Sequence, residues 1–152
     1  MLLEETLDTT TSTLPHFNSL PPMSSAGGTV IMIASGSPPS VTLEGGDTGW
    51  STEGSTLTLR PTKEQPLPVW YNFTFALVTT PEGYSLFGIE IYSSESAAAF
   101  FPAAPDGTVA LNFVNNLAPG DKSASFNVGY VLKAKDGSLI PVDPTITFDP
   151  QT

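Results

Sequence analysis

Apolar and polar residues alternate along most of the chain after about residue 29. The longest example is residues 69–78, where one face carries Val69, Tyr71 and Phe73 and continues with apolar residues. A period of two places successive side chains on opposite faces of a strand. We therefore expect residues 69–78 to form a half-buried strand.

The same alternation, or a short apolar run between turn residues, predicts the other strands. The Ala-rich run that ends at Phe101 fits either one helical turn or an irregular crossover. In all, about eight strands are expected. The seven besides residues 69–78 are 30–34, 40–44, 56–60, 84–93, 108–115, 123–133 and a return strand that starts at Leu139.

Glycine and proline mark the turns between these strands. Residues 36–39 are expected to form a turn, and residues 45–54 a loop that contains Trp50. Asp136-Gly137 predicts a tight turn before the last strand. Pro141 and Pro144 interrupt that strand, which indicates an edge or a kinked strand.

Many short strands without a long helical pattern indicate an all-β protein. We expect a single immunoglobulin-like β-sandwich of antiparallel strands with Greek-key connections, and a jelly roll is the alternative. The sandwich is expected to span residues 29–152, after a polar arm or tail of residues 1–28.

Residues 1–28 are rich in Ser, Thr and Pro and carry isolated large apolar residues. Such a segment fits either a disordered tail or an arm that docks on a neighbouring subunit. The apolar residues that would anchor the arm are Leu3, Leu7, Leu14, Phe17 and Leu20.

The formal net charge is −10, with only 5 Lys and Arg residues. This balance argues against binding to nucleic acid or to an anionic membrane surface. The chain contains no Cys, which excludes disulfides and thiolate ligands. With no apolar segment long enough to span a bilayer and no recognisable signal peptide, we expect a cytoplasmic protein or one placed in a virion.

The sequence offers no set of residues that specifies catalysis. His16 is the single histidine and lies in the polar N-terminal segment, so neither a catalytic triad nor a zinc site is expected. The acidic residues lie mostly in predicted turns, except Glu90, which is expected to face solvent from a strand. We predict no catalytic residues, no metal site and no cofactor.

Trp50 lies in a glycine-flanked loop with Asp47 and Glu53. An aromatic ring beside carboxylates is a common arrangement in carbohydrate-binding β-sandwiches, so these three residues are the candidate ligand contacts. The other interpretation is that the ring of Trp50 folds back and covers the core.

The C-terminal stretch carries short motifs with two family resemblances. Its Phe126-x-Val128-x-Tyr130 pattern, followed by Asp136-Gly137 and then DPTIT, resembles the end of the AidA/PixA inclusion-body-type proteins. The sequence DPTITFDP also resembles the DP-EP family. Val142 differs from the aromatic residue that AidA/PixA proteins tend to carry there. The resemblance implies an immunoglobulin-like sandwich that self-associates and has no known enzymatic activity.

These observations favour a non-enzymatic structural or self-associating protein that acts through contacts with itself or another protein. An inclusion-body-like component and a virion surface or decoration protein both belong to this class. A module that binds carbohydrate or another small ligand through the Trp50 loop is the alternative. A hydrolase that uses paired carboxylates is a third hypothesis.

Overall fold

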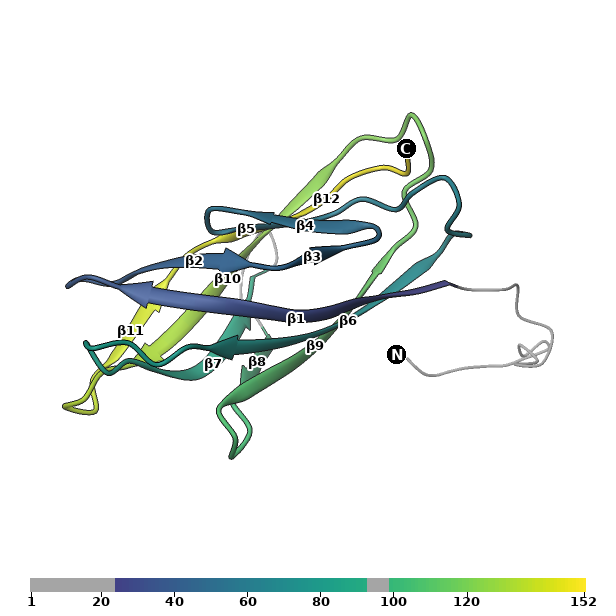
Figure 1. The fold of residues 1–152 in the computed structure, drawn as a ribbon. Coiled ribbons are helices and arrows are strands. Elements are labelled where there is room, and N and C mark those ends of the chain that lie inside the picture. Colours follow the sequence, from purple (N-terminus) through teal and green to yellow (C-terminus); the bar gives the residue numbers. More distant parts are fainter. Residues whose placement is uncertain (1–23, 93–98) are drawn as a thin grey trace.

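The computed structural model describes residues 24–92 and 99–152, which form two packed β-sheets without a helix (Figure 1). These residues contain twelve strands. They are β1 (Ser24–Ser35), β2 (Ser40–Glu44), β3 (Gly46–Asp47), β4 (Trp50–Glu53), β5 (Thr56–Leu59), β6 (Val69–Leu77), β7 (Ser85–Ile91), β8 (Ala99–Pro102), β9 (Thr108–Asn115), β10 (Ala124–Lys133), β11 (Leu139–Val142) and β12 (Thr145–Phe148).

Four strands form the small sheet, in the order β2-β1-β6-β9. The large sheet has the order β3-β4-β5-β12-β10-β7-β8, and β11 pairs with β10. Both sheets are mixed, because β1 runs parallel to β6 and β5 runs parallel to β12. These two pairs differ from the antiparallel arrangement expected from the sequence. Parallel neighbours require a long crossover, and in both cases several strands intervene along the chain.

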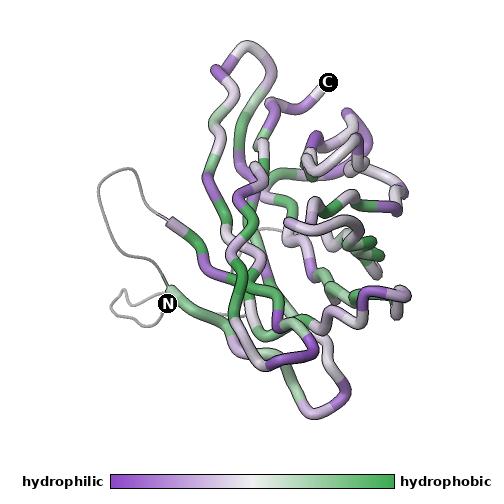
Figure 2. Tube along the Cα trace, turned by 90° about the vertical axis from the view of Figure 1, so that its left-hand side faces the viewer, coloured by the Kyte–Doolittle hydropathy of each residue, from purple (hydrophilic) through white to green (hydrophobic). Residues whose placement is uncertain are grey.

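The core lies between the two sheets. Phe75 of β6 faces Tyr130 of β10, with 6.2 Å between the ring centroids. Both side chains are fully buried, as is that of Tyr71 of β6. In Figure 2 the hydrophilic residues gather in the turns, while much of the hydrophobic colour follows the strands. The expected β-sandwich is confirmed, whereas its immunoglobulin-like and Greek-key details stay a prediction.

Several strand boundaries agree with the alternation in the sequence. β2 and β9 have the bounds expected for residues 40–44 and 108–115. The turn at Asp136-Gly137 is also confirmed, because Asp136 Oδ1 accepts hydrogen bonds from the backbone and the hydroxyl of Ser138.

β1 begins earlier than the sequence pattern indicates. Ser24 pairs with Val69 of β6, and the pairing continues without a break to Met32. The last five residues assigned to the arm therefore belong to the small sheet. Residues 1–23 lie outside the described residues, and with them the five anchors proposed for the arm.

Residues 45–54 form a hairpin instead of the expected loop. Asp47 of β3 pairs with Trp50 of β4, and the turn between them contains Gly49, whose φ is +82°. The hydroxyl of Tyr71 donates a 2.7 Å hydrogen bond to the carbonyl of Gly49. This contact fixes the turn to the core, which the local pattern could not reveal.

The alternation in residues 84–93 predicts that Phe87 and Ile89 share one face of the strand. In the structure they do not, because Ile89 is buried and Phe87 is exposed. The register of β7 shifts, so that Val131 pairs with Gly88 while Leu132 pairs with Leu86. An extra residue in a strand forms a β-bulge and moves the following side chains to the other face. Leu86 therefore enters the core, and Phe87 is exposed.

The end of the Ala-rich run is extended, because β8 pairs with β7 in the large sheet. Of the two alternatives for this run, the helical turn is therefore wrong for Ala99, Phe100 and Phe101. Residues 93–98, which include the other two alanines of this run, lie outside the described residues.

β11 and β12 follow a single register along β10. Val142 pairs with Tyr130, and Thr145 pairs with Asn127, so the register continues across Asp143 and Pro144. β11 contains Pro141 and has only β10 beside it among the described strands, which confirms the expected edge position.

Gly27→Ala should strongly destabilise the small sheet. Gly27 has a φ of +117°, and a Cβ there would lie 2.1 Å from the carbonyl oxygen of Asn72. We expect a loss of at least about 2 kcal/mol, because a clash with backbone adds to conformational strain of about 1–2 kcal/mol. Gly107→Ala is the control, since its φ is +84° and no atom lies within 4 Å. Equal urea midpoints for the two variants would contradict this expectation.

Candidate functional site

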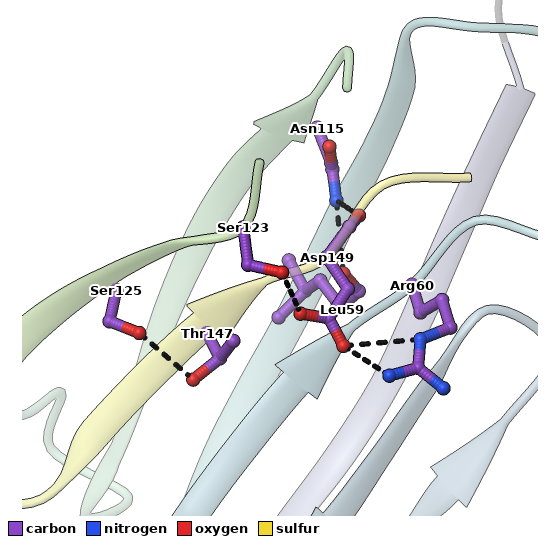
Figure 3. Close-up of polar contacts among 7 residues, drawn as sticks. All are labelled: Leu59, Arg60, Asn115, Ser123, Ser125, Thr147 and Asp149. Atoms are coloured by element: carbon purple, nitrogen blue, oxygen red, sulfur yellow. Dashed lines mark hydrogen bonds and ion pairs between the residues drawn. The ribbon is translucent and has the colours of Figure 1, made fainter. Parts of the chain in front are cut away.

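A polar cluster forms where β5 and β12 end and β10 begins (Figure 3). Arg60, Asp149 and Ser123 adjoin these strand ends, which the register of the large sheet places side by side. Arg60 donates to Asp149 Oδ2 from Nη2 and, over 3.1 Å, from Nε. The Ser123 hydroxyl donates to Asp149 Oδ1 over 2.7 Å. Both carboxylate oxygens therefore have partners within the protein.

Asn115 connects this cluster to the small sheet. It is the last residue of β9 and is completely buried. Its Nδ2 donates to the carbonyls of Leu59, over 3.0 Å, and Asp149, over 2.9 Å. Its Oδ1 accepts the backbone N–H of Leu117 over 2.9 Å. One side chain thus joins the end of β9 to the ends of β5 and β12.

The cluster also sets the ionisation of Asp149. Burial by itself would raise the pKa of this carboxyl group. The hydrogen bonds from Ser123 and Arg60, with the positive charge of Arg60, outweigh burial and hold the pKa of Asp149 below its usual value. Asp149 is consequently an ionised partner of Arg60 near neutral pH.

A hollow of about 380 Å³ lies beside the cluster. Two hydroxyl residues line it, Ser51 of β4 and Thr58 of β5, which pair across these neighbouring strands. The hollow can offer hydrogen bonds and the charges of an ion pair. Its lining residues are Gly49, Trp50, Ser51, Glu53, Thr58, Arg60 and Asp149.

Trp50 belongs to the core as well as to this lining. Its side chain is buried and meets the ring of Phe73 edge-on, with 5.0 Å between the ring centroids. A Cβ at Gly45 would lie 3.0 Å from the indole, so a glycine leaves room for the ring. The interpretation that Trp50 folds onto the core is confirmed.

The structure brings only part of the predicted ligand set together. Glu53 is exposed on β4 and lines the hollow with Trp50. Asp47 is exposed on β3, is absent from the lining, and accepts the N–H of Thr48 over 2.8 Å. His16 lies outside the described residues. Within residues 24–92 and 99–152, no group of three or more His, Cys, Asp and Glu side chains could hold a metal ion.

The polar cluster was not found from the sequence. Asp149-Pro150 predicts the end of a strand, and β12 does end at Phe148, but nothing local indicates partners for the carboxylate. A usable signal was Arg60, the sole arginine, directly after an alternating strand. Its partner Asp149 is 89 residues away, which no spacing argument could supply.

An apolar groove of about 210 Å³ opens between the sheets. The ring of Phe126 lies at 5.2 Å from that of Phe148, which in turn lies at 5.9 Å from that of Phe113. Phe126 remains 42% exposed, so the aromatic cluster is only partly covered. The groove is lined by Ile91, Asn112, Phe113, Phe126, Val128, Ile146 and Phe148.

No family model matches the sequence, and no curated protein matches it. The resemblance to AidA/PixA and DP-EP proteins stays a prediction. The described part of the chain contains no helix with the length and apolar character needed to cross a membrane.

Asp149→Asn should reduce the loss of stability in acid. A carboxylate whose pKa is lowered by folding contributes stability above the unfolded pKa of about 3.9, and this contribution disappears as the pH falls through the folded pKa. The stability difference between the parent and Asp149→Asn should therefore be largest near pH 7 and shrink below about pH 4. Urea unfolding of both proteins at a series of pH values from 7 downward measures this difference.

Asp47→Asn is the control for this experiment, because it removes the same charge from an exposed position. A difference for Asp149→Asn that stays constant across the pH range would show that the ionised carboxylate does not stabilise the fold.

Proposed function

We propose that this protein is a non-enzymatic structural component that self-associates through protein–protein contacts. The observation that carries the proposal is the apolar groove between the sheets, where Phe126 leaves 42% of its surface exposed. Exposed apolar patches beside a packed core are typical of interaction sites. Burying a large apolar side chain contributes about 1.5–3 kcal/mol, so the groove favours an apolar occupant.

A second copy of this chain is the proposed occupant. The N-terminal segment carries Leu14, Phe17 and Leu20 in a Pro- and Ser-containing stretch before β1. Extended chain advances about 3.3 Å per residue, so the 23 residues before Ser24 are long enough to reach a neighbouring molecule. Their spaced apolar side chains fit a role as anchors in such a groove.

The polar cluster supports a structural role in a different way. Ser123 donates to Asp149, and Arg60 pairs with the same carboxylate, so these groups are occupied with each other. A nucleophilic hydroxyl needs a base that withdraws its proton, and the lowered pKa of Asp149 makes its carboxylate a weak base for this step. The cluster therefore acts as a clamp at the strand ends. Inclusion-body-like and virion decoration assemblies are the two forms of self-association that the proposal includes.

Phe126→Ser should weaken self-association. Removing a half-exposed aromatic ring from the groove is expected to cost about 1–2 kcal/mol of contact, or roughly a tenfold weaker association. Light scattering of the full chain over a range of concentrations measures the change in mass. Deletion of residues 1–23, which leaves β1 intact, should have the same or a larger effect.

Leu139→Ser is the matched control, because Leu139 is 49% exposed on β11, away from the groove. A parent protein that stays monomeric at every concentration would remove the proposal. An associating parent with unchanged mass in both the Phe126→Ser variant and the truncated chain would remove the groove and the arm as its basis.

Binding of a carbohydrate or another small ligand is the second candidate, favoured by the polar hollow. We expect Glu53→Gln to reduce retention on a glycan array, because Glu53 lines the hollow and is exposed. Trp50→Ala should instead lower stability by about 3–5 kcal/mol, as expected for a buried aromatic residue. Glu44→Gln, on β2 outside the lining, is the control. No retained glycan with the parent protein would eliminate this candidate.

A further inference from the structure

The edges of the two sheets differ in how well they are protected. Unpaired edge strands invite pairing with another chain, and proteins block them with short strands, proline or charge. β3 has two residues, β8 has four and ends at Pro102, and β11 contains Pro141. On β2, the N–H of Leu43 donates to the carbonyl of Gly54 over 2.8 Å. Four edges therefore carry a recognisable form of protection.

β9 has none of these features. Its eight residues, TVALNFVN, include no proline and no charged side chain. β6 pairs with one side of β9 from Thr108 to Asn115, and no strand of residues 24–92 and 99–152 pairs with the other side. A long, uncharged edge strand of this kind is suited to accept another strand.

The distribution of charge indicates which chain supplies the added strand. The chain carries a net charge of −10, so two copies repel each other over most of their surfaces. The four strands of the small sheet contain a single charged residue, Glu44, on the edge opposite β9. Repulsion between copies is therefore weak at the β9 edge.

We propose that β9 pairs antiparallel with β9 of a second copy, around a two-fold axis, and joins the two small sheets into one. This inference rests on the proposed self-association and adds a contact at the sheet edge beside the groove. Antiparallel pairing of identical strands keeps each side chain on its own face of the sheet. Inward-facing Leu111 and Phe113 then continue the apolar layer beside the groove, and outward-facing Asn112 meets uncharged neighbours.

Single cysteines test this geometry directly, because the chain has no cysteine of its own. Ala110→Cys, Asn112→Cys and Val114→Cys place a thiol on the outward face of β9. Used alone and mixed in pairs, these variants test every antiparallel register of the two β9 strands in which the two-fold axis lies between Ala110 and Val114. Directly opposite residues lie about 4.5–5.5 Å apart, within disulfide range, so one combination should form a covalent dimer under mild oxidation.

Asn72→Cys is the matched control, because Asn72 pairs with Asn112 from the adjacent strand β6 on the same face. In the proposed dimer, two copies of residue 72 lie three strand spacings apart, or about 14 Å. That distance exceeds the disulfide limit of about 7 Å. Equal cross-linking of Asn72→Cys and the β9 variants would show random collision or contact between sheet faces, and would overturn the proposal.

A charge exchange at Asn112 gives a second measurement. Asn112→Glu alone and Asn112→Lys alone should each dissociate, because like charges then lie close together on the two facing β9 strands. A mixture of the two should recover the dimer mass in light scattering. Recovery in the mixture also shows that both variants are folded.

The outcomes separate this inference from the proposed function. An oligomeric parent that gives neither cross-links on β9 nor recovery in the mixture would overturn β9 pairing and leave self-association standing. A monomeric parent at all concentrations would overturn both.

Discussion

The hydrogen bonds of Asn115 are the constraint on which the rest of the sandwich depends. This residue is fully buried at the end of β9, and its amide reaches the carbonyls of Leu59 and Asp149 in the other sheet. A buried polar group left without a partner costs about 1–3 kcal/mol, so the satisfied arrangement disfavours any other alignment of these strand ends. Sliding one sheet over the other would break both contacts together.

The same constraint decides which end of the sandwich is polar. Once Asn115 holds the carbonyl of Asp149, the Asp149 carboxylate lies within reach of Arg60 and Ser123. The ion pair then closes that end with internal contacts. Further along the strands, Phe113 and Phe126 leave the apolar layer partly open. Closure by polar contacts at one end and an open apolar groove beside β9 together favour a protein that acts through contact surfaces.

Charge and edge protection follow the same division between the two sheets. The small sheet holds a single charged residue, Glu44, and ends in the unprotected strand β9. The strands of the large sheet contain four charged residues, Asp47, Glu53, Glu90 and Lys133, and its edges are short or contain proline. Self-association of an acidic chain is least opposed where its charges are sparse. The fold places the strands with the fewest charges together in the small sheet.

The sequence by itself determined the strands and turns that rest on neighbouring residues. Alternation specified residues 40–44 and 108–115 correctly, and Asp136-Gly137 specified a turn, because side-chain period and glycine conformation act locally. Only the tertiary structure decided which strands are neighbours, that a bulge turns Phe87 outward, and that Asp149 meets Arg60. An alternating pattern states which face is apolar, but it carries no information about the strand beside it. Register and partner are set by contacts between residues far apart in the chain.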